Sequence, residues 1–212
     1  MGYPTRTPQL IRGGIVLADP GSGQVLRVIA LQYNPDTLTR SFQIRGVSGD
    51  SAEFTEAMRL RGPPIESIKL EAELDATDRM EAGDGSSLHA RLAQIEALVY
   101  PATGSLRANA AEAAAGSIEI VAMQAPLTLF VWSKSRVLPV RITELSVTEE
   151  SFDAALNPIR AKIGLGLRVL TIDDAGIQSQ AGSLFMAYLE QKEQLAGRAA
   201  NAALATLGIS GI

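Results

Sequence analysis

The chain has 212 residues, of which 46% are hydrophobic and 20% are charged, and this composition predicts a folded protein with a sizeable core. It contains no Cys and one His, His89, which excludes disulfides, thiolate nucleophiles and sites that need two imidazole ligands. The net charge of −4 argues against nucleic acid as the main partner, because binding phosphates needs a surplus of Lys and Arg.

The first residues, Met1–Pro8, are polar and interrupted by proline, unlike a signal peptide. No stretch approaches the roughly 18 consecutive apolar residues that a membrane span needs. We therefore expect synthesis and assembly in the cytoplasm, with release only by a non-classical route.

The first 45 residues predict a β meander. A turn at 19–23 contains the Pro and Gly that such turns favour. Asn34-Pro35-Asp36 interrupts the chain again, because proline cannot donate a hydrogen bond to a strand ladder. Residues 46–62 are rich in Gly and charge and predict a long loop, part of which could be paired. The expected strands cover residues 11–18, 24–33 and 37–45.

The clearest period-two alternation follows Pro63-Pro64. It predicts a half-buried strand, with Ile68, Leu70, Ala72 and Leu74 facing the core and Lys69, Glu71 and Glu73 facing water. The carboxylates of this region could suggest calcium binding or an acid/base pair, but the EF-hand spacing is absent. A solvated face is the favoured interpretation of the cluster Glu71, Glu73, Asp75, Asp78, Glu81 and Asp84.

Helix-capping residues at 84–87 precede apolar residues at helical spacing, namely Leu88, Leu92, Ile95 and Val99. They predict an amphipathic helix of about three turns that stops at Tyr100-Pro101. Residues 102–116 are rich in Ala and fit either a short helix or a mobile loop. Both alternatives remain open.

Two or three further strands are predicted between Ser117 and Asp153, followed by one strand at 159–170 in which the apolar residues share one parity. Pro139 assigns its end of the strand at 136–149 to an edge or bulge position. Gly164 and Gly166 are expected to mark a bend or a close backbone approach. A further short apolar strand is expected at 127–132.

About seven strands and one inserted helix predict a mainly β (α+β) fold, a closed or nearly closed barrel or sandwich with one packed helix. After a linker at 173–176, residues 182–207 predict a helix of more than 20 residues, weakened at Gly197. Its apolar stripe could fold back on its own domain or dock on a partner. Its expected members are Leu184, Tyr188, Gln191 and Leu195, with Phe185 and Leu189 beside them. We expect a domain at 1–172 and a linker with a C-terminal helix at 173–212.

The sequence predicts no catalytic, cofactor-binding or metal-binding residue, no cofactor and no enzymatic activity. His89 has no nucleophile in a suitable motif near it, and Gly21-Ser22-Gly23 is a plain turn. Gly164-Leu165-Gly166 lacks the third glycine of a dinucleotide fingerprint. Residues 83–87 lack the Lys of a phosphate loop.

Residues 31–38, LQYNPDTL, resemble a motif of tube-type proteins, the tube initiators or adaptors in the baseplates of phage-tail-like contractile injection systems. The resemblance continues through PPIESIKLEAELDATD at 63–78, the helix before Tyr100-Pro101, and 126–170. It covers roughly residues 10 to 170. It implies a tail-tube-like β-barrel with a flanking helix, assembled as a ring of six copies.

In that family such rings join the inner tube to the spike-bearing hub, so the resemblance implies the inner tube protein, the hub, and baseplate wedge or sheath components as partners. Family members commonly end in a LysM module, and the helix at 182–207 stands in its place here. We hypothesise that this helix performs the docking. The alternatives are a main inner-tube subunit and, from another class, a cell-wall-acting hydrolase.

Overall fold

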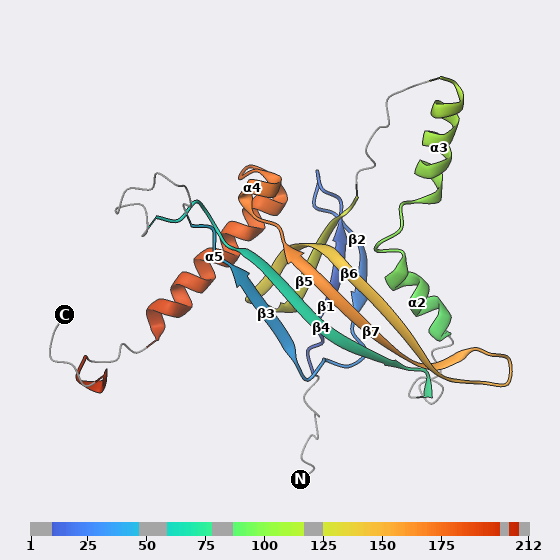
Figure 1. The fold of residues 1–212 in the computed structure, drawn as a ribbon, viewed down its shortest axis with the longest axis horizontal. Helices are drawn as coiled ribbons and strands as arrows, with labels where there is room; N and C mark the ends of the chain where they lie inside the picture. Colours follow the sequence, from blue (N-terminus) through green and yellow to red (C-terminus); the bar gives the residue numbers. More distant parts are fainter. Residues whose placement is uncertain (1–9, 47–58, 78–86, 117–124, 200–203, 208–212) are drawn as a thin grey trace, which may run out of the picture.

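The computed structural model describes residues 10–46, 59–77, 87–116, 125–199 and 204–207. The described strands form one antiparallel sheet of seven strands in the order β2-β1-β5-β6-β7-β4-β3. Figure 1 shows the long strands crossing the centre of the molecule, with helices at both ends of the sheet. The strands are β1 (Gly14–Ala18), β2 (Val25–Ala30), β3 (Leu38–Gln43), β4 (Ile65–Asp75), β5 (Leu127–Ser133), β6 (Arg136–Phe152) and β7 (Pro158–Val169).

The prediction of a mainly β, α+β fold with a packed helix and a C-terminal helix is confirmed. The ladder of described strands is open, because β2 and β3 each have one neighbour and stand at the two ends of the strand order. A barrel closed by hydrogen bonds between its first and last strand is therefore not formed by the described strands of one chain.

The alternation in β4 appears as predicted. Ile68, Leu70, Ala72 and Leu74 are buried, whereas Lys69, Glu71 and Glu73 are exposed. The expected close approach at the two glycines of β7 is also confirmed. A Cβ atom on Gly166 would lie 2.8 Å from the Cβ atom of Glu144, and one on Gly164 would collide with the hydroxyl of Ser146.

The turn predicted at 19–23 connects β1 and β2, and Asp19 organises it. The Asp19 carboxylate accepts hydrogen bonds from the backbone N–H groups of Gly21 and Ser22 and from the Ser22 hydroxyl. Gly23 adopts φ 71°, a conformation that favours glycine. Residues 11–13 and 31–33 were expected in strands but lie outside them, because β1 begins at Gly14 and β2 ends at Ala30.

The predicted edge or bulge position of Pro139 is wrong, because Pro139 is fully buried in β6, between β5 and β7. The strand tolerates it because its carbonyl accepts a hydrogen bond from the Leu170 N–H, just beyond the end of β7. In an antiparallel ladder the N–H and C=O of one residue point to the same neighbour. The missing donor of Pro139 therefore falls where the ladder with β7 has ended.

Helix α2 (Leu88–Glu96) begins at the Ser87 N-cap, whose hydroxyl accepts from the Ala90 N–H, and buries Leu88, Leu92 and Ile95 as predicted. It ends sooner than expected, and Val99 beyond it is 45% exposed. Helix α3 (Thr103–Ala114) settles the open alternative for 102–116 in favour of a helix. None of its residues is buried, and it projects away from the sheet (Figure 1).

The C-terminal helix α5 (Gln180–Arg198) lies against β6 and buries Phe185 and Tyr188 in the main core, so its first half folds back on its own sheet. The predicted length is wrong, because the helix has 19 residues and ends directly after Gly197. Leu195, a member of the predicted stripe, is exposed. The segment expected as a linker, 173–176, contains most of the short helix α4 (Ile172–Ala175), whose start is capped by a capping box between Thr171 and Asp174.

The region expected to be a long loop, 46–62, contains a bridge between Gly46 and Leu60. The Arg61 N–H also donates to the Arg45 carbonyl, so the ends of the region are paired. Residues 47–58 lie outside the described residues. A short 3-10 turn, η2 (Leu204–Leu207), follows α5.

Candidate functional site

The side chain of Gln32, in the motif that carries the family resemblance, closes the end of β4. Its amide nitrogen donates to the Asp75 carbonyl at 2.8 Å, and its amide oxygen accepts from the Asp75 N–H at 3.3 Å. The Arg91 guanidinium of α2 donates to the same oxygen at 3.0 Å. Gln32 is 7% exposed, so these buried polar groups are paired with one another. The motif thus joins β4 to α2.

Asn34 performs the same task for the chain before β1. Its side-chain oxygen accepts from the Gly13 N–H at 2.9 Å, and its amide nitrogen donates to the Ile11 carbonyl at 2.8 Å. Sequence reasoning recognised the motif without this role, because the backbone partners of the two amides lie far away along the chain. The side-chain amides of Gln32 and Asn34 therefore hold backbone segments of the sheet in place.

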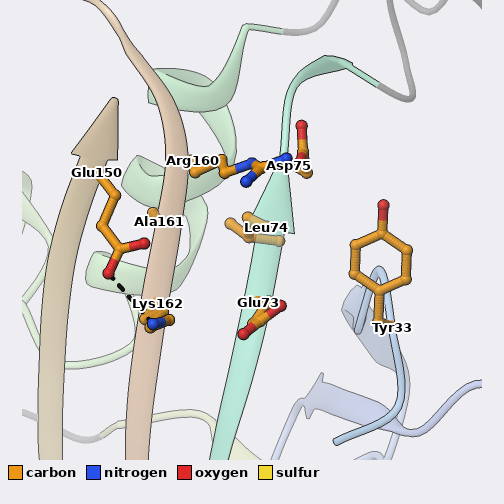
Figure 2. Close-up of a pocket in the computed structure, with 8 residues that line it drawn as sticks. All are labelled: Tyr33, Glu73, Leu74, Asp75, Glu150, Arg160, Ala161 and Lys162. Atoms are coloured by element: carbon orange, nitrogen blue, oxygen red, sulfur yellow. Dashed lines mark hydrogen bonds and ion pairs between the residues drawn. The ribbon is translucent and has the colours of Figure 1, made fainter. Parts of the chain in front are cut away.

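A charged groove of about 400 Å³ crosses the ends of β4, β6 and β7 (Figure 2). Arg160 Nε lies 2.7 Å from an Asp75 carboxylate oxygen, and Lys162 Nζ lies 3.2 Å from a Glu150 carboxylate oxygen. Four of the five charged side chains that line the groove therefore neutralise each other in two pairs across neighbouring strands. Its lining consists of Tyr33, Glu73, Leu74, Asp75, Glu150, Arg160, Ala161 and Lys162.

Two of these groups are held in their charged forms. A hydrogen bond from the Thr77 hydroxyl, aided by the Thr77 N–H and Arg160, holds the pKa of Asp75 below its usual value. The hydrogen bond and charge of Glu150 raise the pKa of Lys162. A general acid or base works best with a pKa near the operating pH, and the pKa values of Asp75 and Lys162 are both shifted away from neutral pH.

The predicted solvated face is confirmed for Glu71 and Glu73, and Asp75 is half-buried and paired. Asp78, Glu81, Asp84 and residues 83–86 of the rejected phosphate-loop pattern lie outside the described residues. Within the described ranges, no group of three or more His, Asp or Glu is placed to hold a metal ion. His89 is exposed, on the first turn of α2.

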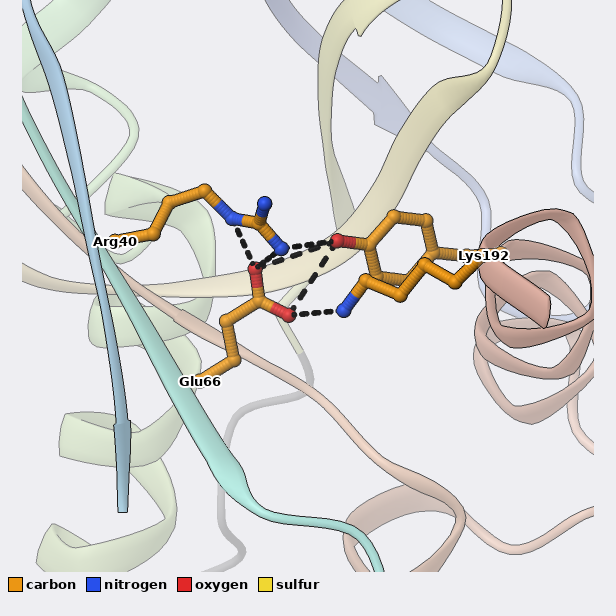
Figure 3. A network of polar contacts seen from close by, with 4 residues as sticks. Arg40, Glu66 and Lys192 are labelled. Atoms are coloured by element: carbon orange, nitrogen blue, oxygen red, sulfur yellow. Dashed lines mark hydrogen bonds and ion pairs between the residues drawn. The ribbon is translucent and has the colours of Figure 1, made fainter. Parts of the chain in front are cut away.

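A buried carboxylate, Glu66, joins β3, β4 and α5 (Figure 3). Glu66 is 3% exposed and receives Arg40 Nε at 2.7 Å and Lys192 Nζ at 3.1 Å. Tyr188 accepts from Arg40 Nη2 at 2.7 Å through its hydroxyl, which lies 3.4 Å from a Glu66 oxygen. Both cations also lie over the Phe42 ring, at 5.0 and 5.2 Å from its centroid. This cluster fixes the end strand β3 to the helix.

The end strands themselves expose apolar side chains. In β2, Val25 and Leu26 are each 57% exposed and Val28 is 63% exposed. At the other end of the sheet, Phe42 of β3 is 46% exposed and Ile44, just after β3, is 72% exposed. Sequence periodicity could not reveal this exposure, because it identifies one apolar face of a strand and not the position of that strand in the sheet.

No family model and no curated protein matches the chain. Among solved structures, a similar chain comes from the tail of an empty GTA particle, computed with helical refinement in C6 symmetry. The two chains share 17% sequence identity with a TM-score of 0.30, and the match covers 74% of this chain and 90% of that chain. None of the described helices is long and apolar enough to cross a membrane.

Proposed function

We propose that the chain is a structural, non-enzymatic subunit of a phage-tail-like contractile injection particle, a ring-forming adaptor that joins the inner tube to the spike-bearing hub within the baseplate. The observation that carries this proposal is the open sheet: among the described residues, each end strand has one strand neighbour, and both ends of the sheet expose apolar side chains. The motif at 31–38 supports it through its resemblance to the tube-type family.

The edge of β2 is unusual for a protein that works alone. Proteins commonly protect edge strands with charges, proline or bulges, because an unpaired edge invites pairing with another chain. β2 contains one charged residue, Arg27, beside three large exposed apolar ones. Its register shifts only next to the turn, between Leu17 and Ala18 of β1, so most of its length is regular. A strand of a neighbouring copy would cover this edge.

The two free edges belong to different strands, so pairing β2 of one copy with β3 of the next makes a contact between unlike surfaces. Repeated with a rotation that closes, such contacts form a ring and leave no free edge. The Glu66 cluster supports this arrangement, because it holds β3 in place from the side of α5. The family resemblance implies six copies, assembled in the cytoplasm into a virion-like particle that can be released.

The partners in this proposal are sister copies, the inner tube protein, the hub, and baseplate wedge or sheath components. We also propose that residues 1–172 form the ring body and residues 173–212 carry the docking element. The first half of α5 anchors that element to the sheet, and the exposed turns after Lys192 are available to a neighbour.

Electron microscopy of the purified protein tests the proposal. We expect six-fold rings for the native sequence and their loss in Val28→Lys, which places a charge on the exposed edge strand. Leu106→Lys is the control, because Leu106 is 47% exposed on α3, a helix to which the proposal assigns no contact, and it should leave the rings intact. A monomer at high concentration and in purified particles would refute the proposal. Many rings per particle would instead identify the main inner-tube subunit.

A further inference from the structure

The two end strands of the described sheet run in the same direction. Every neighbouring pair in the strand order is antiparallel, from β2 and β1 at one end to β4 and β3 at the other. The path from β2 to β3 therefore reverses the strand direction six times. An even number of reversals restores the original direction, so β2 and β3 point the same way along the sheet.

Both end strands have one face towards the core and one face away from it. Ile29 of β2 and Leu38 of β3 pack against the same main core. Because successive side chains of a strand point to opposite faces, the neighbours of these two residues lie on the other face, which we call the outer face. The exposed residues of the outer face are Val28, Ala30, Thr39, Ser41 and Gln43.

The backbone of β2 offers hydrogen-bonding groups at its edge. The Leu31 N–H donates to the Gly13 carbonyl, and the ladder between β1 and β2 continues from this pair in the same register. In an antiparallel ladder, alternate residues turn both their N–H and their C=O to the same neighbour. Ile29 therefore turns these groups to β1, whereas Val28 and Ala30 turn them outward, where no described strand lies.

A ring limits how two such edges can meet. Rotation about the ring axis relates each copy to the next, so every copy turns the same face of its sheet towards the axis. If β2 met β3 of the next copy antiparallel, one copy would have to be turned over about a line across its strands. Its core face would then lie beside the outer face of its neighbour. A parallel contact keeps the core faces together.

We propose that neighbouring copies join through a parallel ladder between β2 of one copy and β3 of the next. The inference rests on the proposed function, because it takes the two unlike edges of the sheet as partners. Ile29 of one copy and Leu38 of the next then lie on the same side of the joined sheet. The residues of the outer face come together on the other side. Each copy thus contributes one parallel contact to a band that is otherwise antiparallel.

Pairs of cysteines measure the direction of this contact, because the native chain contains no Cys and gives no background. Each double variant carries one substitution on β2, either Val28→Cys or Ala30→Cys, and one on β3. A disulfide needs Cα atoms roughly 4.4–6.8 Å apart. Positions two residues apart on a strand are separated by roughly 7 Å, so one pairing should be preferred. The substitutions on β3 are Thr39→Cys, Ser41→Cys and Gln43→Cys.

Oxidation and non-reducing electrophoresis show which pairs join copies. When the cysteine on β2 moves from position 28 to position 30, we expect the strongest partner on β3 to shift by two residues towards Gln43, whatever the register. An antiparallel contact would shift it towards Thr39 instead. That reverse shift, in samples that form six-fold rings by electron microscopy, would overturn the parallel ladder and leave the ring itself standing.

Two controls separate this inference from the proposed function. Val28→Cys combined with Leu106→Cys should stay unlinked, because Leu106 lies on α3, to which no contact is assigned. Val28→Cys alone should also stay unlinked, and a linked pair would mean that two β2 edges meet, which excludes a ring through unlike edges. Rings in which no β2–β3 pair of cysteines links would overturn the edge pairing of the proposed function.

Discussion

Glu66 is the residue on which three elements depend. Its carboxylate is buried and faces two cations, Arg40 and Lys192, with the Tyr188 hydroxyl beside them. A buried charge is costly unless its partners are well placed, and removing one member leaves the others uncompensated. Arg40 and Lys192 are 23% and 36% exposed in their side chains, so each could recover part of this loss by turning to water.

We predict that Glu66→Gln lowers the free energy of unfolding by about 1–3 kcal/mol, since the amide cannot neutralise two cations. Urea denaturation would measure this change. Glu71→Gln, on the exposed face of the same strand, serves as the control and should change stability by less than about 0.5 kcal/mol. Equal effects of the two variants would contradict the structural role of Glu66.

Three aspartates link stability to pH. Hydrogen bonds from Ser22, Thr77 and Asn157 are the largest causes of the lowered pKa values of Asp19, Asp75 and Asp153, respectively. A carboxyl whose folded pKa lies below its unfolded value, about 3.9, stabilises the fold above that value and loses the contribution as pH falls through the folded pKa.

We therefore predict that stability declines below about pH 4 and that Asp75→Asn makes this decline shallower. Thermal unfolding followed by circular dichroism between pH 2 and pH 7 would measure the slope. Thr77→Val, which removes the hydroxyl that donates to the Asp75 carboxylate, should make the decline shallower in the same way. A native slope in Asp75→Asn would show that the bond to Thr77 does not persist in solution.

At the scale of elements, the C-terminal helix combines two different surfaces. Its first turns bury Ala181, Phe185 and Tyr188 against the sheet, whereas Leu195 near its end is exposed. The sequence predicted a helix with an apolar stripe, but it did not decide whether the stripe packs on its own domain or docks on a partner. The face that packs follows from the position of α4, which directs the chain onto β6.

Phe185→Ala should lower the free energy of unfolding by about 3–5 kcal/mol, because Phe185 is 6% exposed in the main core. Leu195→Ala should change it by less than about 0.5 kcal/mol. Chemical denaturation of both variants gives the comparison. A small loss for Phe185→Ala would mean that α5 leaves the sheet in solution and that its packed half is not an anchor.

The elements that could be predicted share a strong local pattern. The alternation in β4, the single parity in β7 and the spacing of Leu88, Leu92 and Ile95 all follow from burying one face. The buried position of Pro139 inside the sheet could not be predicted, since β6 tolerates the missing N–H only because β7 ends opposite it. The candidate surfaces were missed for a related reason: β2 and β3 stand at the two ends of the described strand order, and this order is not a local property of the sequence.

At the scale of the whole molecule, the open sheet predicts that assembly changes hydrogen exchange at its ends and not at its centre. We expect alternate backbone amides of β2 to exchange about tenfold more slowly in assembled rings than in Val28→Lys, because they gain hydrogen-bond partners on the neighbouring copy. Amides of β6, already paired on both sides, should exchange alike in both. Unchanged exchange in β2 would mean that the ring uses other surfaces.

The two ends of the sheet are unlike, since β3 is tied to α5 through Glu66, whereas β2 exposes apolar side chains. A closed ring built from contacts between unlike ends places every copy in the same sense about its axis. The upper and lower surfaces of such a ring differ, so two different proteins can each recognise one of them. A machine that must eject its contents in one direction could take its sense of direction from this asymmetry.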